Sequence, residues 1–384
     1  MTNSHELTEE EFDLLVNREA SLSEANLQEQ VHIAVIGKVS CGKSSFLNAF
    51  FNKKKGEKLI FEVGATSGIT TIAKTYKIND DIFVSDLPGL NDNNQENSQV
   101  TINHLKDVDI GILIVTGSSD TSQKANYDLL KKKCELVYVV LNKIDEYQRK
   151  PKALEDVTKQ WHKDLGLPSN EKIWHTCCDG YDPTDEGDEL YLSGVTELRE
   201  EILQTAFAQK GLKEKALKLT KELEGKSAAA KKAVVMGVIG AVSAAFIPGP
   251  SAAYITAVQI SAILGIHFAY TNEVMSKKVA LALIPFFAGQ AAVSSVFLVA
   301  ISFFPVKVGL EFAAAITAFS ITLPMLASIN WLYKTHGSIE NKAQLKAKFN
   351  EIKSELKKVS LTDLMAQAFK GNFEPLKKII ERFL

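Results

Sequence analysis

The sequence predicts an α/β domain with a mostly parallel sheet, followed by an all-α domain that is rich in apolar residues. Three observations predict this class. Short apolar runs alternate with helical segments over residues 31–208, as in a parallel sheet with helices on both faces. A glycine-rich loop motif follows the first apolar run. Charged residues then become rare over residues 233–333.

The α/β domain is expected over residues 31–210. Its parallel strands are predicted from the apolar runs at residues 31–36, 82–85, 110–115, 136–141 and 172–177. A further strand is expected at residues 71–78. Asn79 and Asp80 favour a tight turn after it, so this strand should pair antiparallel with the run that begins at residue 81.

A phosphate-binding loop is predicted between the first strand and the helical stretch after it. Residues 37–44 match the P-loop pattern G-x-x-x-x-G-K-[ST] in its required strand–loop–helix setting. Glycines let the backbone N–H groups point at phosphates, and the helix N-terminus adds partial positive charge. Lys43 should reach the β- and γ-phosphates, and the Ser44 hydroxyl should ligate Mg²⁺. The candidates are Gly37, Lys38, Val39, Ser40, Cys41, Gly42, Lys43, Ser44 and Ser45.

Two further motifs complete a nucleotide site. Asp86 and Gly89 stand in an Asp-Leu-Pro-Gly sequence, where the carboxylate can hold magnesium and the Gly89 amide can contact a γ-phosphate. Asn142, Lys143 and Asp145 stand in an Asn-Lys-Ile-Asp sequence. The Asp145 carboxylate can accept hydrogen bonds from N1–H and the 2-amino group of guanine, a donor pair that adenine lacks. The sequence therefore predicts binding of GTP and GDP with Mg²⁺, and little binding of ATP.

Other site residues are chosen by their place in the chain. Thr66, Thr70 and Thr71 precede the second strand, and Thr70 or Thr71 is favoured as the switch I ligand of magnesium. The alternative is that each is a β-branched residue at a strand start. Thr176 and Cys177 stand where the last guanine-contacting loop should follow its strand.

Hydrolysis is expected to be slow in the monomer. Leu90 follows Gly89, where a Ras-type enzyme has the glutamine that orients water, and an apolar side chain cannot do so. The candidates for catalysis are Lys43, Ser40, Thr70, Thr71 and Gly89. A basic cluster within residues 53–58 could add charge across an interface between two copies, or could be a solvated loop.

The composition of the chain limits which partners and ligands are expected. A net charge of −2 and a pI of about 6.4 do not indicate a nucleic-acid-binding surface. The cysteines have no C-x-x-C spacing, so reduced cytosolic thiols are favoured over a metal site, and a cytoplasmic location is expected. Residues 1–30 are acidic and polar, lack a signal-peptide core, and predict a helix over about 8–30.

The distribution of charged residues divides the second half of the chain into three segments. A Lys/Glu-rich connector is expected at residues 211–232, a hydrophobic helical domain at 233–333, and amphipathic helices at 334–384. Residues 279–304 carry no charge and are long enough to span a bilayer, and 312–333 form a second such stretch. A membrane hairpin and a compact domain with buried central helices both remain open.

The motifs carry a family resemblance. The P-loop, the sequences at residues 86–90 and 142–145, and the closing stretch 194–202 resemble those of Era/TrmE-like GTPases of the translation-factor class. This resemblance implies GTP hydrolysis. Residues 247–253, continuing into 257–259, resemble the hydrophobic C-terminal domain of the YcjF type.

A GTPase joined to an apolar helical domain is also similar to the immunity-related GTPases and, more distantly, to the dynamin and mitofusin group. Those families act on membranes and often self-assemble, so the resemblance implies a homodimer through the nucleotide face. Ser40 matches the residue of dynamin-like proteins, whereas potassium-stimulated TrmE-type enzymes have asparagine there. The resemblance therefore does not imply stimulation by potassium.

Two functions follow as hypotheses. The first is a GTP-hydrolysing switch or mechanoenzyme that is associated with, or inserted in, a membrane. The second is a soluble regulatory Era-like GTPase whose helical domain binds a protein, such as a ribosome-assembly factor; the near-neutral charge counts against the ribosome. A non-hydrolysing scaffold is a weaker third hypothesis.

Overall fold

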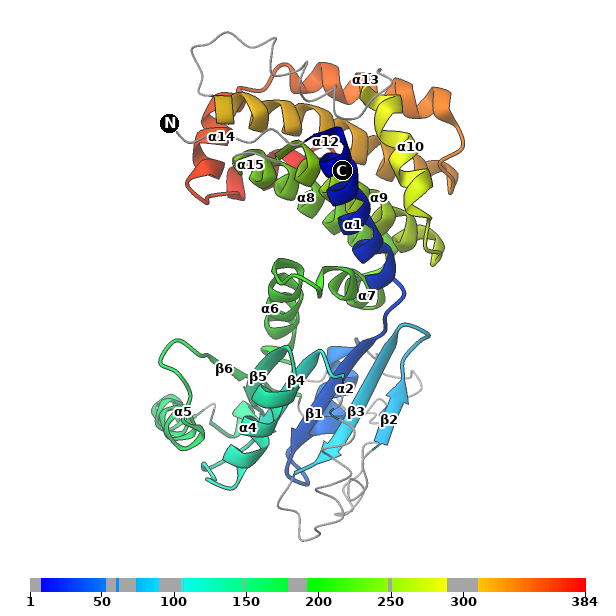
Figure 1. Ribbon diagram of the computed structural model, residues 1–384. Helices are drawn as coiled ribbons and strands as arrows, with labels where there is room; N and C mark the ends of the chain where they lie inside the picture. The colour runs from blue at the N-terminus through cyan, green and yellow to red at the C-terminus, as the bar shows by residue number, and fades with distance from the viewer. Residues whose placement is uncertain are drawn as a thin grey trace. The chain divides into compact units, whose positions relative to one another are not determined.

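The chain forms two compact units, which Figure 1 draws as ribbons. The computed structural model describes residues 8–52, 60–61, 74–89, 105, 107–147, 149–178, 192–247, 251–288 and 310–384. The sheet unit comprises Gln30–Leu219, and the helical unit comprises Met1–Glu29 together with Thr220–Leu384. The division falls inside helix α7 (Lys213–Glu224), within the segment for which the sequence predicts a charged connector.

Within the described residues, the sheet unit has one sheet, with strand order β2-β3-β1-β4-β5-β6. The strands are β1 (Val31–Gly37), β2 (Lys74–Lys77), β3 (Ile82–Pro88), β4 (Ile110–Val115), β5 (Leu136–Leu141) and β6 (Ile173–His175). β2 pairs antiparallel with β3, and the other neighbours pair in parallel. The predicted α/β class and its antiparallel pair are confirmed. Parallel strands place their carboxyl ends at one edge, where such sheets bind ligands.

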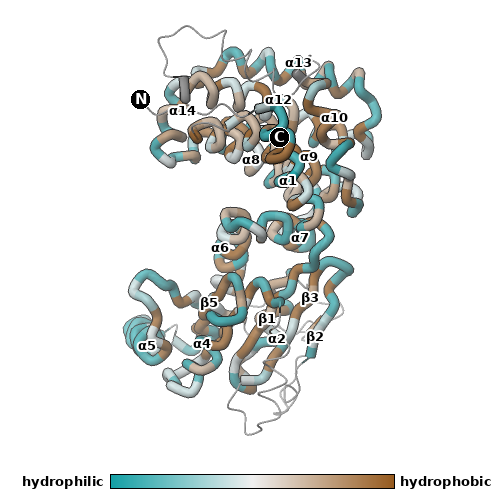
Figure 2. The backbone as a smooth tube through the Cα atoms, viewed as in Figure 1, coloured by the Kyte–Doolittle hydropathy of each residue, from teal (hydrophilic) through white to brown (hydrophobic). Residues whose placement is uncertain are grey.

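Helices cover both faces of this sheet. They are α2 (Lys43–Phe50), α4 (Gln123–Lys133), α5 (Pro151–Leu165) and α6 (Val195–Ala208), with a 3₁₀ turn η1 (Ile144–Tyr147). α2 contacts α6, and α4 contacts α5. The side chains of Leu113, Val139 and Trp161 belong to the buried core between sheet and helices. Accordingly, β1, β3 and β5 consist largely of apolar residues, whereas α5 is largely hydrophilic (Figure 2).

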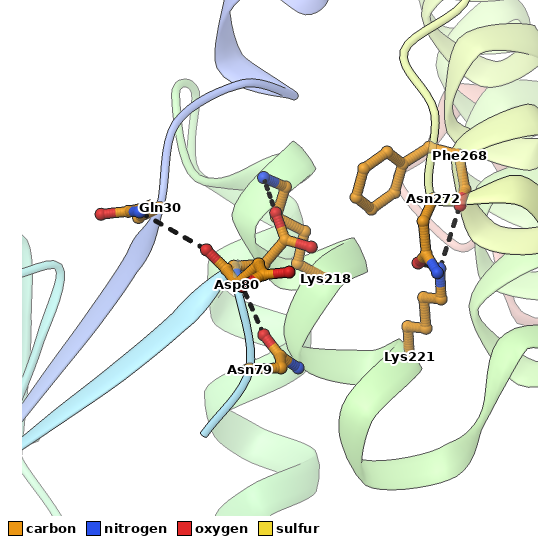
Figure 3. A network of polar contacts seen from close by, with 8 residues as sticks. Gln30, Asn79, Asp80, Lys218, Lys221, Phe268 and Asn272 are labelled. Atoms are coloured by element: carbon orange, nitrogen blue, oxygen red, sulfur yellow. Dashed lines mark hydrogen bonds and ion pairs between the residues drawn. The ribbon is translucent and has the colours of Figure 1, made fainter. Parts of the chain in front are cut away.

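Two ion pairs attach the first part of α7 to the amino ends of the strands. Lys218 Nζ lies 2.6 Å from Asp81 Oδ1, directly before β3. Lys215 Nζ lies 2.7 Å from Asp109 Oδ1, directly before β4. Figure 3 shows the Lys218 side chain beside the turn at Asp80. Since α7 occupies the amino ends, the opposite edge is left for the loops that carry the nucleotide motifs.

The helical unit is all-α in its described part. Its helices are α1 (Glu9–Asn26), α8 (Lys226–Ala245), α9 (Ser251–Thr271), α10 (Lys277–Ala288), α12 (Leu310–His336), α13 (Lys342–Leu356), α14 (Leu361–Phe369) and α15 (Glu374–Glu381). Thr8 caps α1: its hydroxyl accepts from the Glu11 N–H, and the Glu11 side chain accepts from the Thr8 N–H. In the last part of α7, Lys221 donates to the Phe268 carbonyl of α9 (Figure 3).

Three long apolar helices, α8, α9 and α12, form the centre of the helical unit. Gly237 of α8 lets the helices approach closely, because a Cβ there would lie 2.5 Å from Ala262 Cβ and 2.7 Å from Leu326 Cδ1. Gln259 of α9 donates to Thr322 of α12 over 2.7 Å. The buried share of the three apolar segments is 61%, 72% and 72%, so they cover one another extensively.

Among the described residues, α8, α9 and the 312–336 part of α12 are long and apolar enough to cross a membrane by length and composition. The predicted span 312–333 lies within α12. The predicted span 279–304 is described only as far as Ala288, in α10, and the rest lies outside the described residues. Neither α8 nor α9 is among the two spans predicted from the sequence, and α8 begins at Lys226, inside the charged connector.

Candidate nucleotide site

The P-loop lies where the sequence places it, at the carboxyl edge of the sheet. β1 ends at Gly37, and α2 begins at Lys43. A Cβ at Gly37 would lie 2.4 Å from the Ile114 carbonyl oxygen. Gly42 has a φ of +85°, and a Cβ there would lie 2.6 Å from Asn142 Nδ2. Both positions therefore require glycine, for close approach at Gly37 and for backbone conformation at Gly42.

Lys43 and Asp86 form a buried pair of charges beside the loop. The exposed fractions of the two residues are 4% and 3%. Lys43 Nζ donates to the carbonyl oxygens of Gly37 and Lys38 over 3.0 and 3.2 Å. Two backbone carbonyl oxygens thus hold the Lys43 ammonium group at the start of α2, a position that suits phosphate oxygens.

Asp86 lies near the carboxyl end of β3, and one of its carboxylate oxygens has no hydrogen-bond partner among the described residues. This oxygen, Oδ1, is buried. Burial raises the pKa of this carboxyl, against the lowering effects of Lys43, Lys74 and a hydrogen bond from Ser44. A buried carboxylate oxygen without a donor fits a hard cation such as Mg²⁺, and the nearby Ser44 hydroxyl would be a second oxygen ligand.

The Asn-Lys-Ile-Asp motif is joined to the P-loop by a chain of hydrogen bonds. Asn142 Nδ2 donates to the Cys41 carbonyl over 3.0 Å, and Thr176 Oγ1 donates to Asn142 Oδ1 over 3.0 Å. Cys177 Sγ donates to Asp145 Oδ1 over 3.2 Å. The loops after β1, β5 and β6 therefore meet, and the sequence-predicted residues of all three lie together.

Two buried amides that the sequence does not predict lie on α4, and one of them, Asn126, lies beside Gly89. Asn126 and Gln123, on the first turns of α4, are buried, and Asn126 Nδ2 donates to Gln123 Oε1 over 2.9 Å. A Cβ at Gly89 would lie 3.1 Å from Asn126 Nδ2. In the sequence, these residues are visible only as two amide side chains three positions apart in the first turns of the helix after the strand at 110–115. Their place at the site depends on how α4 packs against Gly89, which the sequence does not show.

A small cavity of about 60 Å³ lies behind the P-loop. It is lined by Lys38, Cys41, Asp120, Gln123 and Trp161, among others, and Lys38 forms an ion pair with Asp120. This volume suits water rather than a nucleotide. The Lys38 side chain is therefore engaged with the loop after β4.

The thiols near the site are protected. Cys41, Cys177 and Cys178 are buried, and Cys134 is partly buried; none of these four forms a disulfide. Burial raises the pKa of Cys178 to about 12 and also raises that of Cys41. Across the described ranges, no group of three or more His, Cys, Asp or Glu side chains could hold a metal.

Several predicted residues lie outside the described part of the chain. They are Thr66, Thr70 and Thr71, the basic cluster Lys53, Lys54, Lys55 and Lys58, and Leu90. The proposed roles of these residues in binding magnesium and in catalysis therefore remain predictions.

The comparisons with known proteins agree on the sheet unit. Residues 32–165 match the family model described as 50S ribosome-binding GTPase. GTPase Der of Bacteroides fragilis is 27% identical over 149 residues, which cover 36% of this chain and 34% of that protein. GTPase Era of Campylobacter concisus is 30% identical over 131 residues, covering 33% and 44%. The chain thus spans less than half the length of these relatives.

Among solved structures, an Era variant of Aquifex aeolicus bound to GDP and AlF4⁻ is similar, with 18% identity and a TM-score of 0.35. The match covers 46% of this chain and 57% of that one. The segment that matches the family model runs from β1 to the end of α5 and includes the P-loop, Asp86 and the 142–145 motif. The sheet unit is therefore a P-loop GTPase domain with a mostly parallel sheet, followed in the chain by a helical region.

Proposed function

We propose that the protein is a GTP-binding and GTP-hydrolysing switch or mechanoenzyme that associates with a membrane and assembles with itself. The observation that carries the nucleotide part is the grouping of Lys43, Asp86, Asn142 and Asp145 around one P-loop. The relatives of the sheet unit are named as GTPases, which supports the same activity.

Phosphate and magnesium would bind between the P-loop and the end of β3. Lys43 would exchange its two carbonyl partners for β- and γ-phosphate oxygens. Ser44 and Asp86 would hold Mg²⁺, with Thr70 or Thr71 completing the site when GTP is bound. The cation would supply the Lewis acidity that neutralises developing phosphate charge, and Gly89 would contact the γ-phosphate.

Guanine would bind beside the loops after β5 and β6. Asp145 would accept hydrogen bonds from the base, and the backbone near Cys177 would donate to its oxygen. Asn142 is already fixed by its bonds to the Cys41 carbonyl and the Thr176 hydroxyl. The Asp145 carboxylate selects guanine because adenine offers it no pair of donors and would leave this partly buried charge without base partners.

Hydrolysis would depend on assembly. Leu90 offers no polar atom to orient water, so a second copy facing the nucleotide would supply the missing group. Ser40 has a φ of +62°, a backbone conformation that is uncommon for residues other than glycine. We assign Ser40 a supporting role at this face.

Membrane association is supported by apolar residues that the helical unit leaves exposed. Phe246, Phe312 and Phe369 form an aromatic cluster with ring centroids 5.2 to 6.1 Å apart. Phe369 is 52% exposed, and Ile247 next to Phe246 is 46% exposed. Positions 235, 236 and 239 of α8 are only partly buried and are Val, Met and Ile, where a water-facing helix would carry polar residues.

A second function is favoured by the burial of α8, α9 and α12. Helices that are 61–72% buried by their own fold resemble a soluble core, so the exposed apolar residues could instead receive a protein partner. In that case the protein would be a soluble regulatory GTPase in the cytoplasm. The family description, 50S ribosome-binding GTPase, is compatible with this alternative.

Two assays test the proposal. Equilibrium binding of GDP and ADP, with and without Mg²⁺, tests the nucleotide site: we expect tight GDP binding, and equal affinities would contradict it. Flotation of the full chain with anionic phospholipid vesicles tests the membrane part. Phe369→Glu should reduce flotation, whereas Leu14→Glu, at an exposed position on α1, should not. A wild-type protein that never floats would favour the soluble regulator.

A further inference from the structure

The C-terminal helices carry positive charge in a chain whose net charge is negative. Residues 342–384 hold ten Lys or Arg residues and five Asp or Glu residues, whereas the whole chain has a net charge of −2. The rest of the chain is therefore acidic on balance, and α13, α14 and α15 lie in its basic segment. Such a segment attracts an anionic surface over about 10 Å at 0.1 M salt, the screening length in that solution.

Helix α15 turns two lysines outward because it buries its apolar side chains. Leu376 and Ile380 are fully buried, and α15 packs against α14 and α8. Lys377 and Lys378, directly after Leu376, are exposed. Across the described part of the chain, neither lysine forms an ion pair. The charges of these two lysines are therefore available to a partner.

The end of α14 lies next to the start of α15 and adds an exposed apolar side chain. α14 ends at Phe369, and the Asn372 N–H donates to the Gln367 carbonyl over 3.0 Å, so the connection to α15 is a tight turn. Phe369 and Lys370 are both exposed, and Lys370 forms no ion pair with any described residue. An apolar ring and three free cations thus lie on two short helices in contact. We call these four residues the α14–α15 corner: Phe369, Lys370, Lys377 and Lys378.

We propose that the α14–α15 corner binds anionic phospholipid headgroups and holds the helical unit at the membrane surface. This inference rests on the proposed membrane association and names its lipid. Phe369 enters the boundary between headgroups and acyl chains, and the three lysines attract the anionic headgroups. The corner offers flexible ammonium groups, which suit mobile headgroups better than the fixed carboxylates of a protein partner. α8, α9 and α12 stay packed on one another, so the association is peripheral.

Binding of the full chain to phosphatidylcholine vesicles, with and without about 30% phosphatidylserine, tests the lipid class. We expect at least about tenfold tighter binding with phosphatidylserine, weakening as salt rises from about 0.1 to about 0.5 M, and release by alkaline carbonate. Lys377→Glu/Lys378→Glu should weaken phosphatidylserine binding by about tenfold or more, because each lysine near the surface contributes about fivefold. The matched control is Lys132→Glu/Lys133→Glu, two adjacent exposed lysines of α4 whose replacement changes the net charge equally and should alter binding less than about twofold.

Several outcomes would overturn the inference. Equal weakening by the two double variants would mean that total charge acts, and not the corner. Equal binding to neutral vesicles, or binding that resists salt and carbonate, would remove the lipid assignment and leave membrane association in place. A wild type that binds neither vesicle would instead contradict the proposed membrane association itself, and binding to polyuridine RNA would then assign the lysines to a nucleic acid. Melting temperatures identify a variant that does not fold, and Lys377→Gln/Lys378→Gln then gives the same test.

Discussion

Among the site residues, Asp86 has the environment that most clearly indicates a bound cation. It is buried beside Lys43, and its Oδ1 lacks a hydrogen-bond partner within the described residues. Burial is the main cause of its raised pKa, and it outweighs the attraction of two lysines. A charge held in this way costs stability until a cation or a proton compensates it.

Replacing Asp86 by asparagine should therefore stabilise the nucleotide-free protein. A carboxyl whose pKa is raised by folding stabilises the folded state at low pH, and this contribution is lost as pH rises through the folded pKa. The asparagine amide does not ionise and avoids that loss, so we expect the free energy of unfolding to rise by about 1 kcal/mol at neutral pH. Thermal melting at pH 5 and pH 8 measures it.

The same variant should lose the stabilisation that Mg²⁺ adds in the presence of GDP. The wild type should gain melting temperature from Mg²⁺ with GDP, and less at low pH, where protons compete for the carboxylate. An Asp86→Asn protein that melts lower than the wild type without nucleotide, yet responds to Mg²⁺ as strongly, would contradict the assignment of this residue.

Sequence alone predicts a candidate site residue where a local pattern fixes its position relative to a strand. The P-loop glycines and the motifs at Asp86 and Asn142 stand at or next to the carboxyl ends of strands, so their positions are predictable from spacing alone. Asn126 could not be read in this way, because its place beside Gly89 depends on how α4 packs. The thiol of Cys177 also gains its meaning only from its 3.2 Å contact with Asp145.

At the scale of elements, the parallel strands are predictable because they are short apolar runs, whereas β2, Lys-Thr-Tyr-Lys, is predictable only from the turn at Asn79 and Asp80. The helices of the apolar region were harder to delimit, since burial on several sides removes the periodic pattern that marks an amphipathic helix. α8 shows this: it continues from Lys226 through a charged stretch into an apolar one. Composition places the boundary in the connector at residues 211–232, and the compact units divide inside α7, which lies in that segment.

The close packing of α8 against α9 and α12 predicts a strong effect at Gly237. Gly237→Val should clash with Ala262 and Leu326 and destabilise the helical unit by about 1–3 kcal/mol. GDP affinity should not change, because the nucleotide motifs lie in the sheet unit. Denaturant unfolding and GDP binding of the same variant measure both effects.

Gly240→Ala is the matched control for Gly237→Val. Its Cβ would meet the Val258 side chain, whose Cγ1 lies 2.9 Å away and can rotate, so the cost should be smaller. Equal stability of Gly237→Val and the wild type would mean that α8 does not pack on α9 and α12 in solution.

The whole molecule consists of a P-loop GTPase domain and a helical unit with an apolar core. The length and composition of three helices are compatible with a bilayer, and their extensive mutual burial is compatible with a soluble bundle. The bilayer and the soluble bundle differ in what would surround the exposed side chain of Phe369, and neither length nor composition determines this.

Self-assembly predicts that turnover per molecule rises with protein concentration. A monomer with Leu90 after Gly89 lacks a side chain to orient water, so dimers facing through their nucleotides should hydrolyse GTP faster by several-fold or more. GTPase rates over a hundredfold range of concentration, with the oligomeric state measured alongside, test this. Constant turnover by a monomer would point to a separate activating protein.

In the proposed function, the sheet unit binds guanine nucleotides through Lys43 and Asp145. The most direct measurement is competitive binding of GDP, xanthosine diphosphate and ADP to the wild type, Lys43→Ala and Asp145→Asn. We expect the wild type to prefer GDP, Lys43→Ala to lose most affinity for every nucleotide, and Asp145→Asn to prefer xanthosine diphosphate, because its amide can donate to the C2 oxygen of xanthine. Binding of ADP as tight as GDP, or GDP affinity in Lys43→Ala within a few-fold of the wild type, would contradict the account.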